Sequence, residues 1–152
     1  MGKLKEKYWT LGVEEYSKRL SRYCSLEIIE LPDEKTPDHA SNAQEEMIKR
    51  TEGERILKAL KPGSYCITLA IEGVMLSSEE LAKKINTLGV NGISHISFVI
   101  GGSLGLSEEV LRHADLNLSF SRLTFPHQLI RVVLLEQIYR SYRIINNEPY
   151  HK

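Results

Sequence analysis

The sequence predicts an α/β fold, a mainly parallel sheet flanked by helices, on two observations. Short runs of β-branched and aromatic residues alternate along the chain with longer segments of helical periodicity. One such run, residues 95–100, carries almost no charge and leads into a glycine-rich turn, as a strand covered on both faces does in open α/β sheets. A chain of 152 residues is long enough to bury a core as one domain.

The first part of the chain is expected to form two helices separated by a strand and a loop. Apolar residues recur near the helical period, and Tyr8 and Trp9 among them are assigned to the core. Ser41 or Asn42 is suited to cap the second helix, although Gly53 in its middle is unfavourable for a helix. The expected elements are a helix over 4–22, a strand over 26–31 ended by Pro32, a loop over 33–39 and a helix to about Leu60.

The remaining residues are expected to continue the alternation of strands and helices. Ser77 is suited to cap one helix, and Ser107 to cap a shorter one. The expected elements are strands over 65–71, 95–100 and 116–120, and helices from 77 to about 88, from 107 to 113 and from about 127 to 145. Strands that alternate with helices pair mainly in parallel.

Gly101-Gly102-Ser103-Leu104-Gly105 is the first candidate for a small-molecule site. Backbone amides face outward where a buried strand ends near a helix start, and glycine lets a ligand approach closely. The spacing matches neither the dinucleotide fingerprint nor a P-loop. Spacing alone therefore leaves a ligand cradle and a plain tight turn equally open.

The last predicted helix is apolar around most of its circumference, so it is expected to bury two faces. The second face is predicted to meet another copy of the chain in a two-fold homodimer, and the alternative is a helix at the centre of a single-chain core. The apolar residues are Leu129, Ile130, Val132, Val133, Leu134, Leu135, Ile138 and Tyr139.

Charge and composition describe an ordinary globular protein. The formal net charge is zero, which argues against an indiscriminate polyanion binder. The start has no signal-peptide core and no apolar run reaches membrane-spanning length, so a cytoplasmic location without membrane association is expected. Cys24 and Cys66 lack metal-ligand spacing and are expected to be buried free thiols, with no metal site.

Several short motifs are spread over the whole chain. They are Gly2-Lys3-Leu4-Lys5, Tyr8-Trp9, the run 98–105, Leu118-Ser119-Phe120-Ser121, Thr124-Phe125-Pro126-His127-Gln128, Arg131-Val132-Val133-Leu134, Glu136-Gln137-Ile138-Tyr139-Arg140 and Pro149-Tyr150-His151-Lys152. No single motif is specific, but the combination of Thr-Phe-Pro-His-Gln with a Tyr-His terminus is. Together the motifs resemble the RlmH family, the pseudouridine N3-methyltransferases of large-subunit ribosomal RNA within the SPOUT class.

The resemblance implies a single SPOUT domain over residues 1–152, with a C-terminal trefoil knot and a cofactor pocket within roughly 65–146. It also implies a homodimer with active sites at the subunit interface. Family members begin with a short apolar strand ahead of the Gly-Lys pair, which is absent from this sequence. We expect a start codon assigned late rather than a true loss of the strand.

The activity implied by the resemblance is methylation, by S-adenosylmethionine, of N3 of a pseudouridine in helix 69 of large-subunit ribosomal RNA, on the assembled ribosome. The alternatives are a SPOUT enzyme acting on another RNA such as tRNA, and a noncatalytic ribosome-associated module. Arg140, Tyr150 and His151 would form the catalytic cluster, with the tail reaching across the dimer. The implied cofactor-binding residues are Leu69, Gly101, Phe120, Ser121, Arg122, Leu123, Thr124 and Phe125.

Methyl transfer to an imide nitrogen needs an aligned nucleophile, a route for its proton and stabilisation of the charge that spreads to the flanking carbonyl oxygens. His151 is the leading candidate for contacting the base, since histidine titrates near neutral pH. Arg140 follows Glu136 by four residues, a spacing that equally favours an ordinary ion pair on a helix surface. The other histidines are expected to be structural or solvent-facing, with His127 in a capping or packing role.

Overall fold

A computed structural model describes residues 1–152, and the chain forms two compact units, each built from three segments. The first unit comprises Met1–Lys3, Ile29–Met75 and His95–His127. The second comprises Leu4–Ile28, Leu76–Ser94 and Gln128–Lys152. The six segments alternate between the units along the sequence, so neither unit is a continuous piece of chain.

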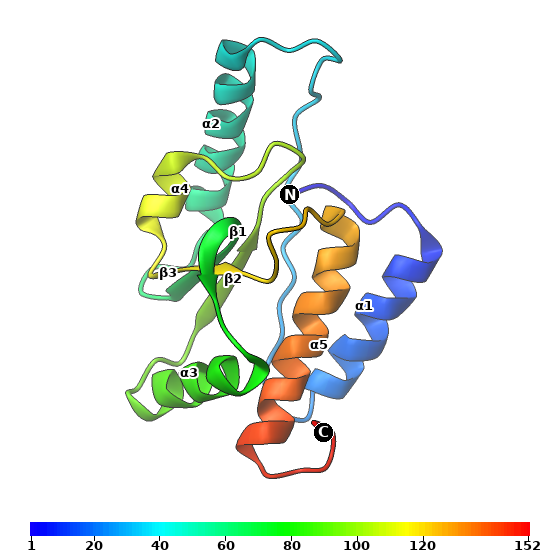
Figure 1. The fold of residues 1–152 in the computed structure, drawn as a ribbon, viewed down its shortest axis with the longest axis vertical. Helices are drawn as coiled ribbons and strands as arrows, with labels where there is room; N and C mark the ends of the chain where they lie inside the picture. Colours follow the sequence, from blue (N-terminus) through cyan, green and yellow to red (C-terminus); the bar gives the residue numbers. More distant parts are fainter. The chain divides into compact units, whose positions relative to one another are not determined.

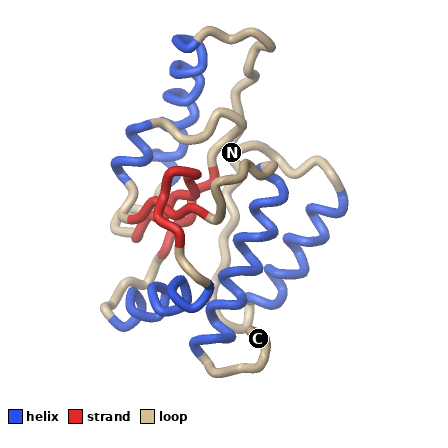
Figure 2. Tube along the Cα trace, in the orientation of Figure 1, coloured by secondary structure: helices blue, strands red, loops and turns tan.

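The first unit holds a three-stranded sheet in the order β2-β1-β3 with every pairing parallel. Figure 1 shows its two helices, α2 and α4, side by side, and Figure 2 shows the three strands together. The parallel sheet with helices confirms the predicted α/β class. The strands are β1 (Tyr65–Met75), β2 (Ile96–Ile100) and β3 (Leu116–Ser119), and the helices are α2 (Asn42–Ala59) and α4 (Glu108–His113).

The core of this unit joins both helices to the sheet. Ile56 of α2 and Val110 of α4 pack with Cys66 of β1 and Val99 of β2, and all four side chains are buried. Burying an aliphatic side chain of this size contributes roughly 1.5–3 kcal/mol. β2 is an edge strand and Val99 is its one buried residue, so the expectation of full cover on both faces was wrong.

β1 is four residues longer than expected, because it continues past Ile71 to Met75. Its register with β3 shifts between Leu69 and Val74. A Cβ at Gly73 would lie 2.6 Å from the carbonyl oxygen of Asn117, so only glycine allows the two backbones to approach this closely. Gly73 therefore permits the strand to extend past Ile71.

α2 begins as predicted, with Ser41 as its N-cap in a complete capping box with Gln44. Gly53, which counted against this helix, faces the N-cap of α4. A Cβ at that position would lie 2.4 Å from the hydroxyl oxygen of Ser107. The glycine therefore costs helix propensity and in return lets α2 and the start of α4 lie in contact.

The second unit consists of helices α1 (Lys7–Leu20), α3 (Ser78–Val90) and α5, which spans His127–Ile145. α1 and α5 run side by side (Figures 1 and 2), and Gly12 is the small residue at their contact. A Cβ there would lie 3.2 Å from the side chain of Val132. Ser77 caps α3 with a capping box to Glu80, as its sequence indicates.

Two expectations in the N-terminal part were wrong. Tyr8 is 61% exposed and Trp9 is half-buried, since neighbouring helix residues point about 100° apart. Residues 26–31 form no strand, although Leu31 accepts a hydrogen bond from the Gly2 amide at 2.9 Å. The boundary between the units falls inside this segment, and the segment joins neither edge of the three-stranded sheet.

The two cysteines differ in burial, so the expectation that both are buried holds for Cys66 alone. Both cysteines are free thiols, Cys66 buried and Cys24 half-buried. Burial raises the pKa of each thiol above its usual value, which keeps both protonated and unreactive near neutral pH. None of the helices combines the length and the hydropathy that crossing a bilayer would require.

We predict that Gly53→Ala lowers the free energy of unfolding by about 1–3 kcal/mol, since its methyl group would overlap the Ser107 hydroxyl. Gly89→Ala in α3 is the matched control, because a Cβ there meets nothing within 4 Å. That control is expected to stabilise the protein by up to about 1 kcal/mol. Urea unfolding of both variants measures the difference, and equal effects would contradict the close contact of α2 with Ser107.

Candidate functional site

The three parallel strands bring the predicted cofactor residues to one edge of the sheet. Leu69 is in register with Ile100 on β2 and with Leu118 on β3. Gly101 follows directly after β2, and Phe120 follows directly after β3. Gly101 and Phe120 therefore leave the same end of the sheet, at the carboxyl ends of β2 and β3, which is where open α/β sheets place ligands.

The glycine turn after β2 is tightly closed. The Gly105 amide donates to the Gly102 carbonyl at 3.1 Å, and the φ of Gly105 is +86°. A Cβ at Gly101 would lie 2.9 Å from the carbonyl carbon of Gly105. The tight-turn interpretation is thus confirmed for the local geometry, and a ligand role for Gly101 stays a prediction beside it.

A buried carboxylate supports this turn from α2. Glu52 is 4% exposed, and its Oε1 accepts a hydrogen bond from the Glu34 amide at 2.8 Å. A Cβ at Gly102 would lie 2.7 Å from the other carboxylate oxygen. Glu52 and its neighbour Gly53 therefore contact successive parts of the loop between β2 and α4. The spacing of residues in the sequence did not indicate these contacts.

Residues 120–125 follow β3 as an irregular loop. Ser121 organises it, because its hydroxyl accepts from the Leu123 amide at 3.0 Å and its carbonyl accepts from the Ser119 hydroxyl at 3.1 Å. Leu123 and Phe125 are 71% and 40% exposed. These two exposed apolar side chains stand on the loop that the resemblance assigns to the cofactor pocket.

In the second unit, Arg140 and Glu136 form the ion pair that their spacing predicts. Glu136 Oε1 accepts from the guanidinium at 2.6 Å and 3.0 Å, and both side chains are largely buried. The hydrogen bond to Glu136 raises the pKa of Arg140 above its usual value. The pair is more than a surface pair, because the same guanidinium also reaches the C-terminal tail.

Tyr150 packs on this ion pair. Its hydroxyl donates to Glu136 Oε1 at 3.1 Å, and the Arg140 guanidinium carbon lies 4.7 Å from the centre of its ring. The ring also meets Tyr139 edge to face at 4.9 Å. Burial, together with hydrogen bonds to Tyr16 and Glu136, raises the pKa of Tyr150 to about 12. The phenol is therefore neutral near physiological pH.

His151 completes the cluster. Its Nδ1 lies 3.2 Å from Arg140 Nη1, and its Nε2 lies 2.8 Å from Glu79 Oε1. Arginine only donates, so Nδ1 must be the unprotonated acceptor and Nε2 must carry the proton that goes to Glu79. A hydrogen bond from the backbone amide of Glu79 to its own carboxylate, and then the one from His151, lower the pKa of Glu79.

The structure thus brings Arg140, Tyr150 and His151 into direct contact, as the resemblance implies. Sequence reasoning did not assign functional roles to the two carboxylates that hold them. Glu136 could have been found from its spacing to Arg140. Glu79 lies 72 residues from His151, and no local pattern in the sequence connects the two.

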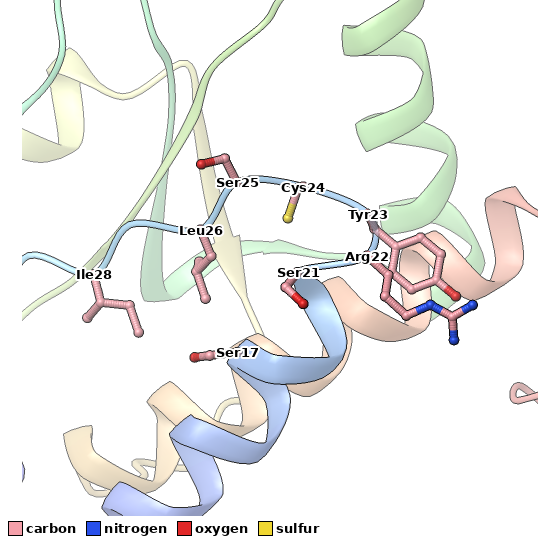
Figure 3. A pocket seen from close by; sticks show the side chains of 8 residues that line it. All are labelled: Ser17, Ser21, Arg22, Tyr23, Cys24, Ser25, Leu26 and Ile28. Atoms are coloured by element: carbon pink, nitrogen blue, oxygen red, sulfur yellow. The ribbon is translucent and has the colours of Figure 1, made fainter.

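Two hollows lie away from these residues. One, of about 850 Å³, is formed by the end of α1 and the chain that follows it (Figure 3), and another, of about 650 Å³, lies between α2 and α4. Neither is lined by a predicted site residue. No group of three or more histidine, cysteine or acidic side chains is placed to hold a metal ion.

We predict that an ultraviolet titration of tyrosinate finds one of the seven tyrosines ionising near pH 12 and that Tyr150→Phe removes it. Because the folded-state pKa is raised above the usual value of 10, the stabilisation is complete below pH 10 and is lost as the pH rises to about 12. If Tyr150→Phe instead removes a tyrosine that ionises near pH 10, the hydrogen bond to Glu136 is not formed in solution.

Comparison with known proteins places this chain in a family. The family model described as "Predicted SPOUT methyltransferase" matches residues 1–151. The chain is 62% identical to the ribosomal RNA large subunit methyltransferase H of Alkaliphilus oremlandii and 62% identical to that of Clostridioides difficile. It is 60% identical to the protein of the same name from Bifidobacterium adolescentis. Each alignment covers 100% of this chain and 96% of the relative. A match over this length, with relatives at this identity, shows that the chain belongs to the SPOUT methyltransferase family, in the RlmH group that its motifs resemble.

Proposed function

We propose that this protein methylates large-subunit ribosomal RNA, at N3 of a pseudouridine in helix 69, with S-adenosylmethionine as the donor. The observation that carries the proposal is the 62% identity, over the whole chain, to proteins named ribosomal RNA large subunit methyltransferase H. The contact among Arg140, Tyr150 and His151 supports it. These residues stand at the positions that the family motif marks, and they are suited to a reaction in which charge develops on the substrate.

The loops at the sheet edge fit the proposed cofactor. Leu123 and Phe125 offer exposed apolar surface for an adenine ring, while Ser121 and Thr124 offer hydroxyl groups for polar contacts. The turn leaves no room for a side chain at Gly101, so a ligand at this position would meet backbone atoms only. When bound, S-adenosylmethionine supplies an activated methyl group on a sulfonium.

The residues of the tail cluster suit the other half of the reaction. Arg140 would stabilise the negative charge that spreads to the carbonyl oxygens beside the attacking nitrogen. His151 Nδ1 is the unprotonated nitrogen and would accept the N3 proton once Arg140 turns from it toward the base. Tyr150, neutral at this pH, would pack against the base and keep Arg140 oriented.

The proposal includes one SPOUT domain over residues 1–152, a trefoil knot within roughly 65–146, a homodimer and a cytoplasmic location. The apolar residues of α5 are buried or half-buried in one copy of the chain, which also suits the alternative of a helix within a single-chain core. The homodimer is therefore supported by the resemblance and by exposed apolar side chains elsewhere, such as Val90 and Leu123. Light scattering should give twice 17.3 kDa.

The proposed activity is tested on ribosomes from cells that lack this protein, with labelled S-adenosylmethionine. We expect label in large-subunit RNA, as N3-methylpseudouridine when the nucleosides are identified by mass spectrometry. Label in tRNA would instead support a SPOUT enzyme with another substrate. No transfer to any RNA, with no binding of the cofactor by calorimetry, would support a noncatalytic ribosome-associated module.

We predict that the two residue sets fail in different ways. Arg140→Ala and His151→Ala are expected to lower the turnover number by about 100-fold or more, with the Kd for the cofactor unchanged. Leu123→Ser and Phe125→Ala are expected to raise that Kd by about tenfold, a loss of about 1.4 kcal/mol of binding.

Calorimetry and single-turnover assays separate these effects. Arg112→Ala is the control, since its exposed ion pair with Glu108 on α4 lies outside both sets. A weaker cofactor affinity in His151→Ala, or a normal one in both loop variants, would contradict the assignment of roles.

A further inference from the structure

The C-terminal tail is fixed to α5 by a second polar cluster that the proposed mechanism does not use. Arg143 forms an ion pair with Glu148, and the Tyr23 hydroxyl donates to Glu148 Oε2 at 2.8 Å. Arg143 Nη1 donates to the Tyr23 hydroxyl at 3.1 Å, and its Nη2 donates to the carbonyl of Pro149 at 3.1 Å. Three side chains and one backbone carbonyl thus converge just before Tyr150.

The backbone at the same place is also closed. The Glu148 amide donates to the Arg143 carbonyl at 2.8 Å, and the Asn147 amide donates to the Ile144 carbonyl at 3.1 Å. Asn147 has a φ of +52°, so the three features form a Schellman motif with an asparagine at its left-handed position. Apolar contact usually joins the two residues that flank such a motif. Here Arg143 and Glu148 join as an ion pair instead.

We propose that Arg143, Tyr23 and Glu148, which we call the tail clamp, are positioning residues that hold Tyr150 and His151 against Arg140. The inference rests on the proposed function, because it assigns these residues to the same reaction. The clamp ends at the Pro149 carbonyl, one peptide before Tyr150, so it leaves little freedom between the fixed turn and the cluster. None of its side chains touches the cluster residues by a hydrogen bond.

The aromatic packing around the clamp argues for a fixed position rather than a loose surface pair. The Tyr23 ring stacks on Tyr142 at 5.6 Å and meets Tyr139 edge to face at 6.1 Å. Tyr139 in turn contacts the ring of Tyr150. Arg143 Nε is buried without a hydrogen-bond partner, which costs free energy. An ion pair exposed at the surface would not have this cost.

The experiment compares wild type with Tyr23→Phe, Glu148→Gln and the exchange Arg143→Glu with Glu148→Arg. Hydrogen–deuterium exchange of the 146–152 peptide measures the tail itself, and steady-state kinetics on ribosomes measures the reaction. Both single variants are expected to speed exchange of the tail and to lower kcat by about 10- to 100-fold, as misplacement of a reacting group does. KM and Kd for S-adenosylmethionine are expected to stay within about twofold, since additive behaviour holds for sites without shared partners.

Rescue and controls keep the outcomes distinct. The exchanged pair is expected to regain part of the lost kcat, which a merely destabilised helix would not do, and Arg112→Ala is expected to match wild type. Tyr23→Phe removes one oxygen only, so it still tests the clamp if the exchange of Arg143 with Glu148 does not fold. Normal kcat with a loosened tail, or a tail that exchanges normally in both single variants, overturns the inference. An inactive wild type would instead overturn the proposed function, while the exchange data still decide whether the clamp holds the tail.

Discussion

Parallel pairing of β1 on both of its edges is the constraint on which the first unit depends. Because β2 and β3 both align with Leu69 near their carboxyl ends, the turn after one and the loop after the other leave the same end of the sheet. The helices contact the loops that leave the sheet. Glu52 and Gly53 fit α2 against the loop that leaves β2, so the glycine turn is shaped by packing as well as by its own sequence.

In the second unit, hydrogen bonds and ion pairs hold the polar groups of a short C-terminal tail in place. Glu136 neutralises Arg140 while it accepts a hydrogen bond from Tyr150, and Glu79 fixes the ring of His151. Each of these contacts involves a charged group, and such bonds are roughly twice as strong as neutral ones. A tail of a few residues after α5 can therefore be ordered without a hydrophobic core of its own.

The sequence predicted the elements with strong local signals and missed those that depend on distant partners. Serine caps located the starts of α2, α3 and α4, since a cap is formed within four residues. Residues 26–31 have the composition of a strand, but a strand also needs a partner strand, and a local pattern cannot show that this segment pairs with none. The exposure of Tyr8 and the extension of β1 through Gly73 likewise depend on tertiary context.

The same division holds for the candidate site. The family resemblance named Arg140, Tyr150 and His151, and their mutual contact is consistent with it. Glu136 had a local signal in its four-residue spacing. Tyr23 had none, because more than a hundred residues separate it from Glu148, and a contact of that range is invisible to periodicity.

The alternation of six chain segments between two units bears on how the protein is synthesised. The first unit lacks β3 until residues 116–119 have emerged, and the second lacks α5 until residues 128–145 have followed. Long-range pairings of this kind fold slowly, since distant segments must find one another before any of them is buried. The nascent chain therefore leaves α1 and the apolar residues near Ile28 without their final neighbours through most of translation, and exposed apolar segments of this kind are prone to aggregation until the chain is complete.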